Sequence, residues 1–258
     1  MRNILAIAGK ELRSYFHSPI AYLVLAIYSG LCGFFFYSFV ATYIVQVFRM
    51  MEMGNMGGPP PNINEWIVRP LFEGIITVVL LLLIPLITMR LFAEEKRSGT
   101  IELLLTSPLT DFQIIMGKFL GALGLYVAMM ILTFIYVGML FVYGNPSGLP
   151  LVANALGLLL FGAGLLALGM WISSFTKNQI IAGAASFAVF LLLYVLNWVN
   201  GYSSSEAGRV LSYLSLTTHF DNFAKGVIDL SDVVYYVSVI VIGLFLTARS
   251  VEALKGRP

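Results

Sequence analysis

The residues best suited to chemistry or to binding gather in one segment, residues 94–113. It begins with the charged run Glu94-Glu95-Lys96-Arg97 and continues as Ser98-Gly99-Thr100-Ile101-Glu102-Leu103-Leu104-Leu105-Thr106-Ser107-Pro108. Three consecutive leucines in a charged segment would face water unless lipid or a partner covered them. The segment therefore indicates either a docking surface for another protein or a helix that lies on a lipid surface.

Start and stop signals within this segment predict a short helix of about two turns. Gly99 allows a sharp turn, and Thr100 is a suitable N-cap. Glu102 would lie in the first turn, where a carboxylate favours the helix dipole, and Pro108 would stop the helix. A second helix is expected to follow at once, because Thr110 and Gln113 have the spacing of a capping box.

No other pattern in the chain points to catalysis. The pairs Gly9-Lys10 and Gly117-Lys118 lack the remaining residues of a phosphate-binding loop. Cys32 is the one cysteine in the sequence, and His17 and His219 are the only histidines. We therefore expect no catalytic residue, no metal site and no cofactor in this chain, and the net charge of +2 gives no reason to expect a nucleic-acid partner.

The composition indicates whether the protein folds in water or in a lipid bilayer. Hydrophobic residues make up 59% of the 258 residues, and charged residues only 11%. Too few charges are present for a water-soluble domain of this length. The sequence predicts an all-α, polytopic membrane protein, in which helices satisfy their own backbone groups within lipid.

Six predominantly apolar stretches are long enough to cross a bilayer as helices, because a crossing needs about 20 residues. Pro85 predicts a kink near the end of the second, and the turn-forming residues 144–150 separate the third from the fourth. We expect the spans at about 20–47, 71–92, 115–143, 151–175, 179–199 and 233–248.

The distribution of lysine and arginine predicts the orientation. Of the 15 basic residues, all but four fall in segments on the side of the membrane that holds the amino terminus. The positive-inside rule then places both termini in the cytoplasm, as an even number of spans requires. The four on the opposite side are Arg49, Arg69, Arg209 and Lys225.

Residues 1–17 have the pattern of an amphipathic helix at the cytoplasmic surface. Apolar residues such as Leu5, Leu12 and Phe16 recur at helical spacing against Lys10 and Arg13. Two interpretations remain open for this helix, a membrane anchor and a contact with a partner.

Several of these motifs together resemble a known family, the permease subunits of type-two ABC exporters. The resemblance is carried by Lys10-Glu11-Leu12 with Ser18-Pro19-Ile20, by the segment from Glu94 to Pro108, and by Gly117-Lys118-Phe119. It covers essentially the full length. Within the family, residues 214–229 most resemble the gliding-motility (GldF-like) permeases. The permease of nitrous-oxide-reductase maturation is the second subfamily that the chain resembles.

The resemblance implies how the site residues work. Residues 94–113 would form the cytoplasmic coupling loop, with Gly99 to Pro108 against an ABC ATPase subunit that holds ATP and Mg²⁺. Glu94 and Glu95 match the acidic residues at the base of this loop. The connecting helix beside it would carry Lys10, Glu11, Leu12 and Arg13, and a homodimer in the bacterial inner membrane is expected.

The resemblance also implies a short external helical pair at 203–229, between the last two spans. Leu214, His219 and Phe220 would belong to a gate or a structural plug there, with Ser205 as a cap and Phe220 resting in the lipid interface. Residues 49–69 form a longer external loop of unassigned use.

The sequence leaves three functions open. In the first, an ATPase drives export through the bundle, because no span carries an ionisable residue near its centre that could couple transport to ions. In the second, the same architecture passes motion to a membrane-anchored external partner and moves no solute. In the third, the chain is a passive channel or scaffold. The aliphatic and aromatic spans are compatible with a lipid or amphiphilic substrate.

Overall fold

The computed structural model describes residues 2–52, 61–105, 108–144, 146–199 and 206–255, and within these ranges every regular element is helical. The helices in chain order are α1 Arg2–His17, α2 Pro19–Glu52, the π-helices η1 Asn64–Val68 and η2 Pro70–Ile76, α3 Thr77–Thr88, α4 Ala93–Ser98, α5 Thr100–Leu105, α6 Asp111–Tyr143, α7 Gly148–Ser173, α8 Gln179–Val199, α9 Glu206–Tyr213, α10 Leu216–Ala224 and α11 Leu230–Lys255. Thr106 and Ser205 lie outside the described residues.

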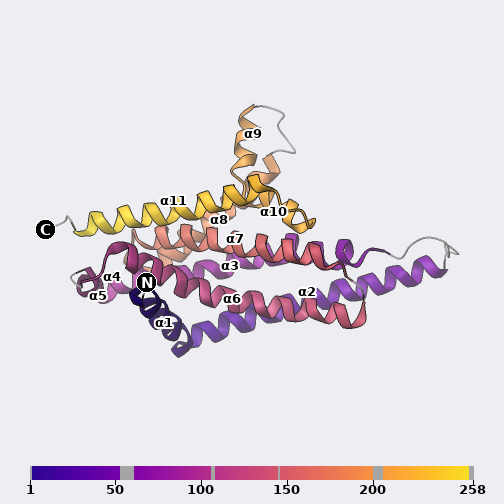
Figure 1. Cartoon of the computed structure of the whole chain (residues 1–258), viewed down its shortest axis with the longest axis horizontal. Helices are drawn as coiled ribbons and strands as arrows, with labels where there is room; N and C mark the ends of the chain where they lie inside the picture. The colour runs from indigo at the N-terminus through magenta and orange to yellow at the C-terminus, as the bar shows by residue number, and fades with distance from the viewer. Residues whose placement is uncertain (1, 53–60, 106–107, 145, 200–205, 256–258) are drawn as a thin grey trace.

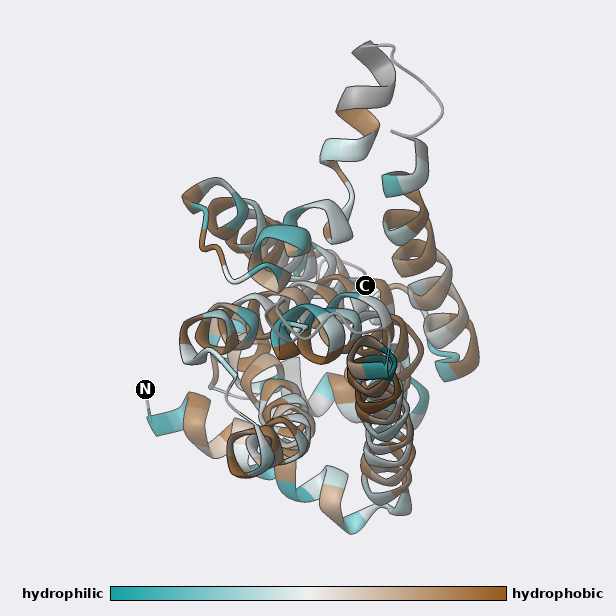
Figure 2. Cartoon of the chain, turned by 90° about the vertical axis from the view of Figure 1, so that its right-hand side faces the viewer, coloured by the Kyte–Doolittle hydropathy of each residue, from teal (hydrophilic) through white to brown (hydrophobic). Residues whose placement is uncertain are grey.

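Six helical stretches in the described ranges are long and apolar enough to cross a membrane, which confirms the predicted all-α fold with six spans. In Figure 1 the long helices run side by side, and α1, α4, α5 and the end of α11 gather at one end of the bundle, here called the terminal end. Figure 2 shows apolar residues on several sides of the long helices, as expected where lipid replaces water as the solvent.

The second span differs from the expected stretch of residues 71–92. Its helix begins earlier, at Asn64, and passes through the π-helical segments η1 and η2 into α3, which ends at Thr88. Met89 donates the last backbone bond to the carbonyl of Pro85, and residues 89–92 form a turn. The kink expected at Pro85 stays a prediction, and α3 ends at Thr88, one turn after this proline.

The other spans lie close to the predicted stretches. Helices α6, α7 and α8 cover the expected third, fourth and fifth spans. Helix α2 extends to Glu52, and α11 begins three residues before the expected start and continues to Lys255. The capping box is present, since Thr110 accepts from the backbone N–H of Gln113 and the Gln113 side chain accepts from that of Thr110.

Helix α7 lies at the centre of the bundle and contacts α3, α6, α8, α10 and α11. Glycines allow this close packing. A β-carbon at Gly162 would lie 2.1 Å from the ring of Tyr126, and one at Gly157 would lie 2.5 Å from Phe223. The Tyr126 hydroxyl donates to the carbonyl of Leu158 on the same helix, so its ring is fixed against Gly162.

We expect Gly162→Ala to lower the free energy of unfolding by about 1–3 kcal/mol, because the added methyl overlaps the Tyr126 ring. Unfolding midpoints in mixed detergent micelles measure this loss. Gly138→Ala is the matched control, since no atom lies within 4 Å of a β-carbon there and alanine favours a helix by up to about 1 kcal/mol. Equal midpoints for the two variants would contradict the expectation.

Helix α1 packs along the first half of α6. Gly117 faces Ile7, and a β-carbon at Gly121 would lie 2.6 Å from Cβ of Glu11. Gly124 faces Leu12, whose nearest atom would lie 3.3 Å from a β-carbon. The apolar face of α1 is therefore covered at least in part by α6, at the terminal end of the bundle.

Candidate functional site

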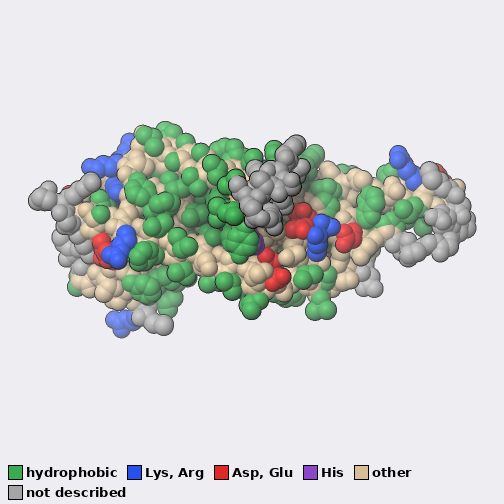
Figure 3. All heavy atoms as spheres, turned by 90° about the horizontal axis from the view of Figure 1, so that it is seen from above, with side chains coloured by type: hydrophobic (Ala, Val, Ile, Leu, Met, Phe, Trp, Pro, Cys, Tyr) green, Lys and Arg blue, Asp and Glu red, His purple; other side chains and the backbone are tan. Residues whose placement is uncertain are grey.

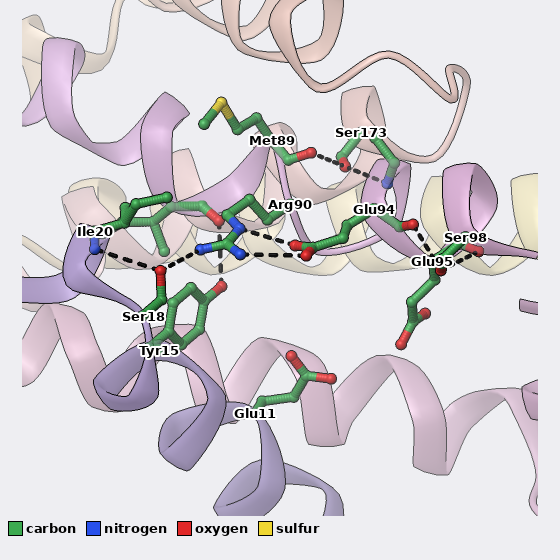
Figure 4. Close-up of polar contacts among 12 residues, drawn as sticks. Glu11, Tyr15, Ser18, Ile20, Met89, Arg90, Glu94, Glu95, Ser98 and Ser173 are labelled. Atoms are coloured by element: carbon green, nitrogen blue, oxygen red, sulfur yellow. Dashed lines mark hydrogen bonds and ion pairs between the residues drawn. The ribbon is translucent and has the colours of Figure 1, made fainter. Parts of the chain in front are cut away.

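Five charged residues join α1, α4 and α6 to the end of the second span. They are called the charged base here: Glu11, Arg90, Glu94, Glu95 and Lys118. Figure 4 shows most of them around the turn that follows α3.

Lys118 is the most buried member of the charged base, with a side chain only 2% exposed. Its Nζ atom lies 2.9 Å from Oε1 of Glu11 on α1 and 2.7 Å from Oε1 of Glu95 on α4. The ammonium also faces the ring of Phe92 at 5.5 Å. One cation therefore connects three helices, and the pairing offsets the cost of removing it from water.

Arg90 makes the second connection. Its Nε and Nη2 atoms donate to the two carboxylate oxygens of Glu94 at 2.8 and 3.2 Å, and Nη1 donates to the hydroxyl of Ser18 at 3.1 Å. A two-pronged arginine–carboxylate pair fixes both distance and orientation. The junction between α1 and α2 is thereby connected to the first turn of α4 (Figure 4).

The turn between α3 and α4 is held by side chains of other helices. The Tyr15 hydroxyl donates to the carbonyl of Ile87 at 3.2 Å. Ser173 of α7 donates to the carbonyl of Met89 and accepts from the N–H groups of Phe92 and Ala93, each at 3.2 Å. These bonds satisfy backbone groups that a helix end leaves unpaired.

Burial raises the pKa of the Tyr15 phenol well above its ordinary value, and the neighbouring Glu11 raises it further. The hydroxyl therefore stays protonated at physiological pH, and the bond to Ile87 persists as the pH varies.

Helix α5 follows α4 directly, and Gly99 is the single residue between them. Gly99 has a φ of 74°, a left-handed conformation that suits glycine and produces the predicted sharp turn. The hydroxyls of Ser98 and Thr100 lie 2.8 Å apart across it. Thr100 is the first residue of α5 rather than the residue before it, so the expected N-cap position was one residue off.

The structure brings together some of the predicted site residues and leaves others apart. Glu11, Glu94 and Glu95 meet in the charged base, whereas Lys10 and Arg13 are exposed on α1. In α5 and beyond, Gly99, Thr100, Glu102 and Pro108 are exposed and Ile101 is half-buried. Leu103, Leu104 and Leu105 belong to α5 by their backbone.

The predicted helical pair between the last two spans corresponds to α9 and α10. Leu214 is exposed, but His219 and Phe220 are buried, so the expectation that Phe220 rests in the lipid interface was wrong. Phe220 packs against Phe161 of α7 with ring centroids 5.7 Å apart, which the small residues of α7 permit.

A cavity of about 820 Å³ lies between α2, η2, α8 and α10. Aromatic side chains and two carboxylates line it: Phe39, Tyr194, Trp198, Phe220, Glu73 and Asp221. Asn197, Thr217 and Thr218 add further polar groups, so the lining is mixed rather than mainly apolar.

Sequence reasoning missed two features of the molecule. The sequence indicated no ion-pair partner for Lys118 or Arg69. Lys118 served there only as part of a motif and as one of the basic residues that predict the orientation, and Arg69 only as one of those basic residues. Their partners lie far away in the chain, such as Glu11 for Lys118 and Asp221 for Arg69. An unpaired lysine next to a glycine at the start of a span was the only available signal.

The fold and the charged base define a multi-pass membrane protein whose spans are tied together at one end. The chain belongs to the ABC-2 family of transporter proteins, since the family's sequence pattern matches residues 5–249. It is thus a permease component of an ABC transporter, and it is a protein of the bacterial inner membrane.

Two curated relatives share 26% identity with the chain over 202 residues. Both are described as "Probable multidrug ABC transporter permease YbhR", one from Escherichia coli K12 and one from Escherichia coli O157:H7. The aligned region is 72% of this chain and 54% of each relative, so the chain spans about half the length of the curated relatives it matches.

Proposed function

We propose that this chain is the membrane subunit of an ATP-driven exporter, in which a separate ABC ATPase subunit binds ATP and Mg²⁺ and moves the spans through α5. The observation that carries the proposal is the charged base beneath α5. Helix α4, which precedes α5, is ion-paired to the end of the second span and to α6, and Lys118 of α6 is ion-paired to α1. A push on α5 can therefore reach all three.

The proposed path of the motion begins at α5, which would bind the ATPase. The terminal end of the bundle would then face the cytoplasm. Motion of α5 passes across Gly99 to α4. From α4, Glu94 acts on Arg90 at the end of the second span, and Glu95 acts on Lys118 at the start of α6. Because Lys118 also holds Glu11, α1 moves with them.

The proposed cargo is a lipid or another amphiphile. The cavity beside η2 supports this, because aromatic walls with two carboxylates suit a molecule that has one apolar and one polar part. We propose that a second copy of the chain pairs with this one in the membrane. The second candidate function is transmission of motion to a membrane-anchored external partner without transport, which the resemblance to gliding-motility permeases favours.

Charge reversal at Glu102 together with Leu104→Asp tests the docking of the ATPase. We expect the ATPase no longer to co-purify, because α5 would present a reversed charge and a carboxylate at the contact. Lys177→Glu is the matched control, since this exposed residue lies at the same end of the bundle between α7 and α8. Full retention of the ATPase by the double variant would refute the assignment.

One measurement distinguishes export of a substrate from transmission of motion without transport. With the ATPase bound in lipid nanodiscs, an exporter is expected to hydrolyse ATP faster when a transported amphiphile is added. Absence of stimulation across lipids and amphiphilic dyes would contradict export and favour the transmission of motion to an external partner.

A further inference from the structure

The cavity between α2, η2, α8 and α10 has an uneven distribution of charge. The carboxylates of Glu73 and Asp221 belong to its lining, and no lysine, arginine or histidine is among the described residues that line it. In the view from above, Figure 3 shows acidic and basic side chains gathered in a patch on an otherwise largely hydrophobic face. Charged side chains are therefore concentrated in few places, and those that line this cavity are all negative.

The cations that pair with these carboxylates lie outside the lining and compensate the negative charge only in part. Nε of Arg69 donates to Oε2 of Glu73 at 2.9 Å, and Nη2 lies 3.2 Å from Oδ1 of Asp221. Arg69 also pairs with Glu65 at 3.5 Å, and Lys225 pairs with Asp221. The network thus contains three carboxylates and two cations, which leaves one negative charge in excess.

Glu73 carries the carboxylate that is most available to a ligand. Its Oε2 atom accepts from Arg69, whereas its Oε1 atom has no hydrogen-bond partner within the described part of the chain. The side chain is 40% exposed. Both carboxylate oxygens of Asp221 are engaged, one by Arg69 and the other by Lys225. A positively charged ligand can therefore pair with Glu73 without displacing Arg69.

Four aromatic side chains line the same cavity: Phe39, Tyr194, Trp198 and Phe220. Tyr194 and Trp198 lie one turn apart on α8, and their ring centroids are 6.4 Å apart. The face of an aromatic ring is negative and attracts an organic cation, most strongly when the ring is that of tryptophan. The rings and Glu73 therefore favour the same sign of charge in a ligand.

The helix ends at the cavity do not reverse this preference. Asn197 and Trp198 lie in the last turn of α8, where the carbonyl groups carry partial negative charge. Thr217 and Thr218 lie in the first turn of α10, where the N–H groups carry partial positive charge. Because the two helix ends oppose each other, the side chains determine which sign of charge the cavity selects.

We propose that this cavity binds an amphiphile whose polar part is an organic cation. The positive charge pairs with Glu73, and the apolar part lies against Phe39, Tyr194 and Trp198. A volume of about 820 Å³ accommodates a drug-sized molecule. The cation is the cargo of the proposed exporter, so its assignment rests on the proposed function, but binding in the cavity requires neither ATP nor the ATPase.

Two lipophilic ions of nearly the same shape and opposite charge, tetraphenylphosphonium and tetraphenylborate, test the sign of charge. Equilibrium dialysis with the purified full chain in neutral detergent micelles measures their binding without ATP, and protein-free micelles provide the blank. We expect the phosphonium to bind about fivefold more tightly than the borate, because Glu73 and the ring faces attract only the cation. Equal binding, tighter binding of the borate, or no binding above the blank would overturn the proposal.

Substitutions at Glu73 test where the cation binds. We expect Glu73→Gln to weaken phosphonium binding about fivefold without weakening borate binding, whereas Glu73→Asp keeps the charge and should retain most of the affinity. Glu65→Gln is the matched control, since it removes a carboxylate from the same Arg69 but not from the cavity lining, and it should leave the affinity unchanged. Equal losses in the two glutamine variants would contradict binding at Glu73.

A further variant tests the aromatic lining independently of the carboxylate. Trp198→Leu removes a ring from the cavity without changing its charge, and we expect it to weaken phosphonium binding about threefold. Trp66→Leu is the control, because Trp66 lies in η1 outside the lining. Unchanged binding in both Glu73→Gln and Trp198→Leu would overturn the site. Co-purification of the ATPase with the Glu102 variant does not depend on any of these results, so the binding site and the proposed function fail separately.

Discussion

Replacing Lys118 with methionine is expected to lower the free energy of unfolding by about 3–5 kcal/mol, because Glu11 and Glu95 would be left without their cation. The two carboxylates are only 15% and 17% exposed, so water replaces the lost ammonium poorly. Methionine fills a similar volume, and the loss therefore reports charge rather than a cavity. Unfolding by sodium dodecyl sulfate in mixed micelles, followed by tryptophan fluorescence, measures it.

Two comparisons isolate the cause of this loss. Lys177→Met removes an exposed lysine and should leave the unfolding curve in place. Adding Glu11→Gln and Glu95→Gln to Lys118→Met should recover most of the stability, since no unpaired charge then remains in the base. A triple variant as unstable as Lys118→Met would show that packing rather than charge governs this site.

Gly121→Leu is the second substitution with a large expected effect, a loss of about 3 kcal/mol, because over-packing is compounded by a broken ion pair. Its β-carbon alone would lie 2.6 Å from Cβ of Glu11 and 3.1 Å from the carbonyl of Ala8. Helix α1 must move away, and Glu11 then leaves Lys118. We expect trypsin to cut at the exposed Arg13 at least tenfold faster.

Gly138→Leu provides the control in the same helix, since nothing lies within 4 Å of a β-carbon at that position. It adds the same side chain to α6 without touching α1. Equal trypsin rates for the two leucine variants would mean that α1 does not depend on the close approach at Gly121.

The sequence was sufficient to predict the features that depend on local pattern. The six spans follow from the length and apolar character of their stretches, the turn at Gly99 from the conformational freedom of glycine, and the start of α6 from the spacing of Thr110 and Gln113. Each of these depends on residues within a few turns of one another, so their physical causes can be read along the chain.

The charged base and the ion pair between Arg69 and Asp221 could not be predicted in the same way. Lys118 and Glu11 are 107 residues apart, and Arg69 and Asp221 are 152 apart. Nothing local distinguishes a lysine that will be buried between two carboxylates from one that marks the membrane surface. The π-helical start of the second span was also missed. The apolar pattern predicts which residues lie within the lipid, but it does not predict that the helix begins before them or that its first turns are π-helical.

The packing of α1 on α6 has a consequence for synthesis of the protein. Helix α1 leaves the ribosome about 100 residues before the glycines of α6 that receive it, so in the meantime the part of its apolar face that packs on α6 is not yet covered by that helix. We expect this face to rest on the lipid surface of the nascent complex until the third span has been inserted. Anchoring to lipid and docking to protein are then successive stages in the biogenesis of the same helix.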